Sequence, residues 1–333
     1  MPPRLIKVSR GDLTLTRQRR GKGFCYLAAD GSLVCEPEAK TRIKALGIPP
    51  AWHDVRIAHH PRAHIQVLGV DNAGHEQYIY HPDWERKRES KKQRRLALLT
   101  GVLPRLRRRV NEHLKAEAGS RELALAIAVA LIDKTAMRLG REKYLEANGT
   151  RGAGTLYSRD VTVSADEITM KFDAKGGKRA EYSLRDKALA DAIARIKTLP
   201  GKRLLVYRGE DGKVTPIRTP AINLYLREQA GVEISAKDFR TLHASALAAE
   251  ALAQVEDNLS ESARRRQMSR VAREVSQVLR NTPVICRKSY IAPGLFKLFN
   301  EGKLKALWNA GGKGRPGLLT RERRLAEVLA TVS

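Results

Sequence analysis

Cysteine is scarce in this sequence: there are 3 among 333 residues, Cys25, Cys35 and Cys286. They form no CxxC pair, so neither a zinc site nor a disulfide framework is indicated. Long apolar runs are also missing, because the longest, residues 123–132, is too short to span a bilayer and is followed by Asp133. The opening Met-Pro-Pro-Arg lacks the apolar segment of a signal peptide. We therefore expect a protein of a reducing interior, the cytoplasm, with no membrane segment.

Acidic residues are outnumbered. The chain has 63 Lys and Arg against 36 Asp and Glu, a formal net charge of +27. Hydrophobic residues make up 42%, enough for a core, so wholesale disorder is not expected. An excess of positive charge on this scale predicts a polyanionic partner. Nucleic acid is the default, and an anionic membrane surface is the competing partner on composition alone.

Metal-binding patterns are also few. His59, His60 and His64 are close in sequence, but Pro61 breaks any helix that would align His60 with His64. We therefore expect no metal at these histidines.

A chain of 333 residues suggests about two domains. The patterns predict an α+β protein with a small β-rich N-terminal domain and a larger, mostly helical domain. We expect the following segments: a flexible arm at 1–17, the β-rich domain at 18–84, a basic linker at 85–96, the helical domain at 97–310, and a tail at 311–333.

Two hairpins are predicted in the β-rich domain, one over residues 24–35 and one over 63–80. In the second, Gln77-Tyr78-Ile79-Tyr80 alternates, so Tyr78 and Tyr80 share one face of the strand and Ile79 takes the other. The tyrosine face either meets nucleic acid or is half-buried in the sheet, and spacing alone favours the second interpretation.

The linker carries a basic run at residues 86–95. Such a run is usually a solvated face, but at a domain junction it can also contact phosphates. The candidate contacts are Arg86, Lys87, Lys91, Lys92, Arg94 and Arg95.

Three basic residues stand at the ends of predicted elements. Arg138 falls in the last turn of a helix predicted over 121–139, Lys175 at the tip of a hairpin over 167–184, and Arg240 in the first turns of a helix opened by a Ser235–Asp238 capping box. Taken singly, Arg138 interacts with the helix dipole and Lys175 is solvated. A helix N-terminus such as that near Arg240 also suits a phosphate.

The stretch 281–290 follows a helix that Pro283 ends. Asn281 lies at the break, and a short helix from Val284 brings Tyr290 towards the same region. A phenol has a pKa near 10, so it is a poor nucleophile unless its surroundings stabilise charge.

Taken in order, these segments resemble the signature of type IB DNA topoisomerases, most closely their bacterial and poxvirus-like branch. The residues that carry the resemblance are Arg138 in Met-Arg-Leu-Gly, Lys175 at the hairpin, Lys237-Asp238-Phe239-Arg240-Thr241, Asn281-Thr282-Pro283 and Lys288-Ser289-Tyr290. The strand Gln77–Tyr80 resembles the DNA-facing strand of that branch's N-terminal domain. The resemblance covers residues 18–300.

The resemblance implies a chemistry. Tyr290 would attack the scissile phosphorus and form a 3′-phosphotyrosyl link, leaving a 5′-hydroxyl. Arg138 and Arg240 would donate to the non-bridging oxygens, Asn281 would add a hydrogen bond, and Lys175 would protonate the departing 5′-oxygen. The family needs neither metal nor ATP.

The resemblance also implies a partner and an arrangement. The partner would be duplex DNA, clamped between the two domains by a monomer associated with the nucleoid, with no membrane involved. Many relatives have histidine where this chain has Asn281, although asparagine is known in bacterial members, so the rate and pH profile stay open. Two alternatives remain: a tyrosine recombinase or integrase, although recombinases usually carry histidine at the position of Lys237, and a non-enzymatic basic DNA-binding protein.

Overall fold

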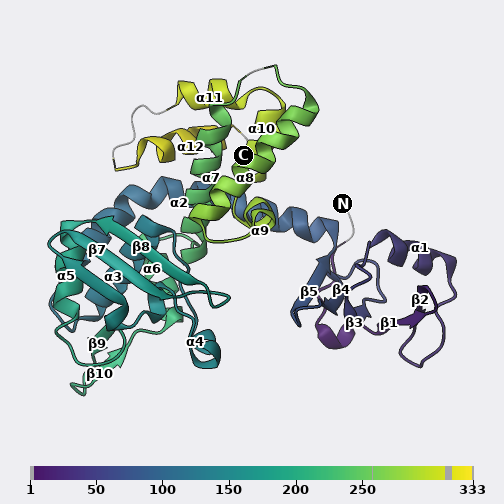
Figure 1. Ribbon diagram of the computed structural model, residues 1–333, viewed down its shortest axis with the longest axis horizontal. Helices are drawn as coiled ribbons and strands as arrows, with labels where there is room; N and C mark the ends of the chain where they lie inside the picture. Colours follow the sequence, from purple (N-terminus) through teal and green to yellow (C-terminus); the bar gives the residue numbers. More distant parts are fainter. Residues whose placement is uncertain (1–3, 257, 312–316, 332–333) are drawn as a thin grey trace. The chain divides into compact units, whose positions relative to one another are not determined.

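The computed structural model describes residues 4–256, 258–311 and 317–331. The chain divides into two units, Met1–Lys91 and Lys92–Ser333, and each is described by itself (Figure 1). The first contains a small sheet and the second is mainly helical, which confirms the predicted α+β class. Within the described ranges, no helix is both long and apolar enough to cross a membrane.

The first unit is built on a five-stranded antiparallel sheet with the order β2-β1-β3-β4-β5. Its elements are η1 (Arg10–Asp12), β1 (Leu15–Arg20), β2 (Gly23–Leu27), α1 (Pro37–Ala45), β3 (His53–Ile57), β4 (Ile65–Val70) and β5 (Glu76–Tyr80). Alternating side chains such as Val55, Ile57 and Val67 pack with Ile43 of α1 into a small core.

The predicted hairpin over 63–80 is confirmed by β4 and β5. The hairpin predicted over 24–35 is confirmed in part. Leu33 makes an antiparallel bridge to Leu27, and the Val34 N–H donates to the Tyr26 carbonyl at 2.9 Å, but residues 32–35 form no strand. The full ladder of β2 is with β1, a pairing that was not predicted. Residues expected in a loose arm also join this unit: Leu13 and Leu15 are buried. Residues 1–3 of that arm lie outside the described residues.

Helix α2 (Pro82–His113) contains the whole basic run expected as a linker. Its buried leucines, Leu96, Leu99, Leu103 and Leu106, recur every three or four residues and form one apolar face. That face packs with α3 (Arg121–Thr135), which is buried nearly all round as its sequence predicts.

The second unit carries two small sheets beside α3. They are β6 (Val161–Ser164), β7 (Glu167–Asp173) and β8 (Arg179–Arg185) in the order β6-β7-β8, and the pair β9 (Val206–Arg208) and β10 (Val214–Pro216). The β7–β8 pairing confirms the hairpin predicted around Lys175. The other elements here are α4 (Glu142–Asn148), η2 (Ala153–Thr155), η3 (Ser158–Asp160), α5 (Lys187–Ile196) and α6 (Thr219–Ala230).

Four of the remaining helices pack against α7 (Ala236–Ala253), and α9 (Pro283–Ser289) packs against α8 (Glu261–Val278) (Figure 1). The other helices are α10 (Pro293–Asn300), α11 (Leu304–Ala310) and α12 (Thr320–Ala330). The expected tail therefore includes an ordered helix: Arg107 of α2 forms ion pairs of 2.8 Å with both Asp133 of α3 and buried Glu322 of α12. Residues 312–316 and 332–333 of the tail are not among the described residues.

Candidate active site

Arg240 is the most deeply placed of the predicted site residues, with 3% of its surface exposed. Ser235 and Asp238 form the predicted capping box that starts α7, which puts Arg240 in the second turn. Its guanidinium donates one hydrogen bond to the carbonyl of Ala136 and a second, of 2.9 Å, to that of Leu279. The Nε–H of Arg240 is buried and has no hydrogen-bond partner among the described residues. The side chain therefore bridges the ends of α3 and α8, and its other N–H groups can still donate to a ligand.

Arg138 lies in the loop after α3. The prediction that it occupies the last turn of that helix is wrong, because α3 ends at Thr135 and Ala136 adopts a left-handed cap with φ 53°. Arg138 Nη2 donates to the carbonyl of Arg280 at 3.0 Å. Burial, and next the positive charge of Arg240, lower the pKa of Arg138. The two guanidiniums are thus close enough to repel each other, and an anion between them would relieve that repulsion.

Tyr290 is the C-cap of α9, and its backbone is fixed on both sides. Thr282 caps the start of the helix with its hydroxyl and Pro283 takes the first position, one residue before the predicted start at Val284. The Tyr290 N–H donates to the carbonyl of Cys286 at 3.0 Å, and the Tyr290 carbonyl accepts from the hydroxyl of Ser245 at 3.3 Å.

The ring of Tyr290 is half-buried and faces cations. The guanidinium carbon of Arg240 is 4.9 Å from the ring centroid, and the ammonium of Lys237 is 5.5 Å from it. Cations on a π-face hold an aromatic ring in place. The same cations gather positive charge around a phenol, which can act as an oxygen nucleophile.

Asn281 follows α8 in a Schellman motif. Its N–H donates to the carbonyl of Ser276 at 2.9 Å, and the N–H of Arg280 donates to that of Gln277 at 3.2 Å. The Asn281 side-chain oxygen accepts from the N–H of Thr282 at 3.1 Å. That assignment leaves the amide NH₂ to donate elsewhere.

Lys175 stands exposed at the tip of the β7–β8 hairpin, as predicted. Gly176 and Gly177 both take positive φ, 80° and 69°, which the turn requires. The turn is closed by a 2.9 Å hydrogen bond from the Ala174 N–H to the Lys178 carbonyl. Lys175 has no hydrogen-bond or ion-pair partner among the residues that the structure describes. The structure therefore brings Arg138, Arg240 and Tyr290 together, puts Asn281 next to them in the chain, and leaves Lys175 on a solvated hairpin.

Comparison with known families decides the identity. Residues 81–296 match the model described as "Eukaryotic DNA topoisomerase I, catalytic core", and residues 23–71 match "Bacterial DNA topoisomerase IB, N-terminal domain". The chain belongs to the type IB DNA topoisomerases. It is an enzyme of that class, and the resemblance seen in the sequence is confirmed. All five predicted catalytic residues fall inside the matched core.

Viral relatives agree with this assignment. The DNA topoisomerase 1B of Acanthamoeba polyphaga mimivirus is 28% identical over 298 residues, which cover 86% of this chain and 87% of the viral protein. The DNA topoisomerase 1B of Vaccinia virus (strain Copenhagen) is 30% identical over 108 residues, covering 32% of this chain and 34% of the viral protein.

Two residues hold the backbone around Tyr290 in place by contacts that the sequence did not predict. Ser245, fully buried on α7, accepts from the Ala292 N–H at 3.0 Å as well as donating to Tyr290. Lys92, predicted to contact phosphate, donates to the carbonyls of Lys288 at 3.2 Å and Ile291 at 3.0 Å, one on each side of Tyr290. The sequence did offer one signal for Ser245, because it is a serine in the alanine-rich stretch of α7.

The other DNA-binding candidates have mixed settings. Tyr78 and Tyr80 share a face, as predicted, with ring centroids 5.9 Å apart and nearly parallel planes. Arg88 lies over the Tyr80 ring at 5.1 Å, and the Gln77 amide donates to Asp71 at 2.8 Å. Of the basic run, Arg86, Lys87, Lys91 and Arg94 are exposed, whereas Arg95 lies 3.8 Å from Glu233 and 4.0 Å from Asp238.

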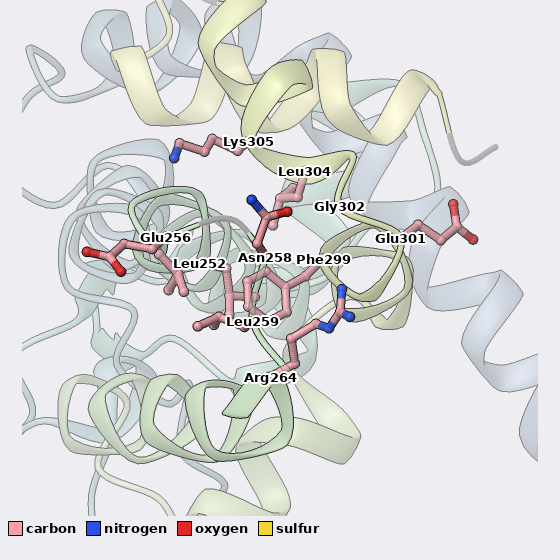
Figure 2. A pocket seen from close by; sticks show the side chains of 11 residues that line it. Leu252, Glu256, Asn258, Leu259, Arg264, Phe299, Glu301, Gly302, Leu304 and Lys305 are labelled. Atoms are coloured by element: carbon pink, nitrogen blue, oxygen red, sulfur yellow. The ribbon is translucent and has the colours of Figure 1, made fainter. Parts of the chain in front are cut away.

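A cavity of about 540 Å³ opens elsewhere in the second unit, between the ends of α7, α8, α10 and α11. Figure 2 shows Leu252, Leu259 and Phe299 at its centre and charged side chains such as Arg264 at its rim. Leu252 lies twelve residues beyond Arg240 on α7, roughly 18 Å along the helix. The cavity is therefore separate from the Tyr290 cluster. Across the described ranges, no three His, Cys, Asp or Glu residues are grouped as metal ligands would be.

Proposed function

We propose that this topoisomerase relaxes supercoiled duplex DNA by breaking and resealing one strand through a 3′-phosphotyrosyl bond at Tyr290, without ATP or metal. One observation carries the proposal above all others. Arg240 is a buried cation with no carboxylate partner among the described residues, and it lies against the Tyr290 ring. An unpaired buried charge is costly, so the site favours an anion, and a phosphodiester fits beside the phenol.

In this mechanism the Tyr290 oxygen attacks the scissile phosphorus and its proton passes to water. The bond from phosphorus to the 5′-oxygen breaks, and Lys175 gives that oxygen a proton. Arg138 and Arg240 donate to the non-bridging oxygens, where charge grows in the transition state, and Asn281 adds a donor from its NH₂ group. Resealing is the reverse reaction, and the phosphotyrosine conserves the bond energy.

The duplex would be gripped by both units. The stacked Tyr78 and Tyr80 and the exposed residues of the basic run would contact it, and closing on DNA would bring the Lys175 hairpin to the scissile phosphate. All five catalytic side chains come from one chain, so a monomer suffices. Binding should fall steeply with salt, because phosphate contacts release counterions. A cytoplasmic, nucleoid-associated location stays a prediction.

The direct test uses negatively supercoiled plasmid in EDTA without ATP. We expect relaxation, and we expect denaturant to trap protein on the 3′ end of the broken strand, with the DNA-linked peptide containing Tyr290. Relaxation only on plasmids with defined paired sites would instead identify a recombinase. If the protein bound DNA tightly but gave neither relaxation nor an adduct, it would be a non-enzymatic DNA-binding protein.

The departure at Asn281 gives a second test. Asn281→His should keep relaxation within about tenfold of the wild type, because the backbone N–H makes the Schellman bond and imidazole can still donate to phosphate. Imidazole titrates near neutrality, so the variant's relaxation rate should vary between about pH 5 and 8 where an amide's does not. The rate is measured across that range for both proteins. Complete loss in a folded Asn281→His protein would contradict the role assigned to Asn281.

A further inference from the structure

Arg280 occupies a backbone position that glycine normally fills. It is the C′ residue of the Schellman motif after α8, with φ 48°, in the left-handed region that side chains with a Cβ rarely adopt. Ending the helix does not require an arginine there. Its contacts provide a separate reason for it.

The Arg280 side chain binds the strand that leads to Lys175. Its Nη2 donates to the carbonyl of Glu181, and its guanidinium carbon lies 4.9 Å from the ring centroid of Tyr182. Both residues are on β8. Towards the hairpin tip, β8 stays paired with β7 from Glu181 to Arg179, and the turn that carries Lys175 lies directly beyond that last pair. Arg280 therefore contacts the hairpin at Glu181, two residues from Arg179, where the pairing of the two strands ends at the turn.

The Arg280 backbone faces the opposite way, into the cluster. Its carbonyl accepts the 3.0 Å hydrogen bond from Arg138, and the next residue is Asn281. One residue thus contacts the general-acid hairpin by its side chain and an anion-binding arginine by its main chain. The contacts of Arg280 therefore connect the hairpin that carries Lys175 with the cluster of Arg138, Arg240 and Tyr290.

We propose that Arg280 is a positioning residue that fixes the Lys175 hairpin relative to Arg138 and Tyr290, so that the ammonium reaches the departing 5′-oxygen. This role rests on the proposed function. Losing the guanidinium would free the hairpin and slow the step that needs a proton, while the nucleophile and the two other arginines stay in place.

The test pairs Arg280→Gly with two DNA substrates. Glycine accepts the left-handed conformation, so the variant should melt no lower than the wild type. One substrate has the normal 5′-oxygen at the scissile bond. The other has sulfur there, whose thiolate leaves without a proton. We expect single-turnover cleavage of the oxygen substrate to slow at least about tenfold, and cleavage of the sulfur substrate to stay near the wild-type rate. Lys175→Ala should show the same pattern, and Arg280→Lys should recover part of the oxygen rate.

Arg265→Ala is the matched control for losing one positive charge, because Arg265 is exposed on α8, the helix that Arg280 follows, and pairs with Glu261 one turn away at 2.5 Å. It should cleave both substrates at the wild-type rate. If Arg280→Gly cleaved both substrates equally slowly, or slowed on neither, the positioning role would be wrong. The proposed function would still hold as long as the wild type formed the Tyr290 adduct. Absence of a Tyr290 adduct in the wild type would refute both.

Discussion

Tyr290→Phe is expected to abolish relaxation and the covalent adduct while DNA binding stays at the wild-type level. Phenylalanine lacks the oxygen that would attack phosphorus, so cleavage should fall by at least about 10⁴-fold. The aromatic ring remains, and with it the contacts at 4.9 Å to Arg240 and 5.5 Å to Lys237. The backbone bonds of the residue, to Cys286 and from Ser245, do not involve the side chain.

The measurement is adduct formation on DNA whose scissile strand is labelled at its 5′ end, in denaturing gels, beside filter binding of the same duplex. Tyr207→Phe is the matched control, because Tyr207 is half-buried on β9 and its ring lies 5.9 Å from the Arg121 guanidinium, with no part in the cluster. It should form the adduct at the wild-type rate. An adduct of normal yield in Tyr290→Phe would show that another residue carries the DNA.

Local signals in the sequence placed most of the cluster correctly. The two glycines after Lys175 and the alternation on either side encode the hairpin, and the Ser235–Asp238 capping box encodes the start of α7. The short helix predicted from Val284 is α9, which Thr282 and Pro283 start one residue earlier. Each signal lies within a few residues of the element it specifies, so no knowledge of tertiary contacts was needed.

The end of α3 could not be predicted in this way. Gly140 is the residue that a left-handed helix end prefers, so the pattern extends the helix to it. In the structure the helix stops earlier, at Ala136 with φ 53°, and the Ala136 carbonyl accepts from Arg240. That partner lies more than a hundred residues away in sequence, and a tertiary contact of this kind leaves no local pattern.

The β1–β2 hairpin was missed for a different reason. Gly21, with φ 57°, and Lys22 form the two-residue turn, but the flanking strand is Arg-rich and lacks apolar alternation. Ala29-Asp30-Gly31 offered a stronger turn signal nearby. The contacts of Ser245 and Lys92 could not be predicted, because their partners are backbone carbonyl and N–H groups, which give no pattern in the sequence.

Arg240→Lys is the second change with a large expected effect. Arg240 donates to two carbonyls, of Ala136 and Leu279, and still has N–H groups for a phosphate, including the buried Nε–H. Lysine keeps the charge but is a single point donor, so it cannot bridge both carbonyls and also bind two phosphate oxygens. Losing one such transition-state donor set should slow cleavage by about 10²–10³-fold. Leaving a buried carbonyl unpaired should also lower the free energy of unfolding by about 1–3 kcal/mol.

Those two effects are separable with a matched arginine. Arg195 of α5 is partly buried, donates to the carbonyl of Leu114 and lies outside the cluster. Arg195→Lys should lose stability in denaturant titrations yet cleave at the wild-type rate. Single-turnover cleavage is compared well below the melting temperature of both variants. Only the Arg240 variant would lose a donor to the phosphate. If Arg195→Lys lost as much rate as Arg240→Lys, weakened packing would explain both losses and the phosphate role of Arg240 would be wrong.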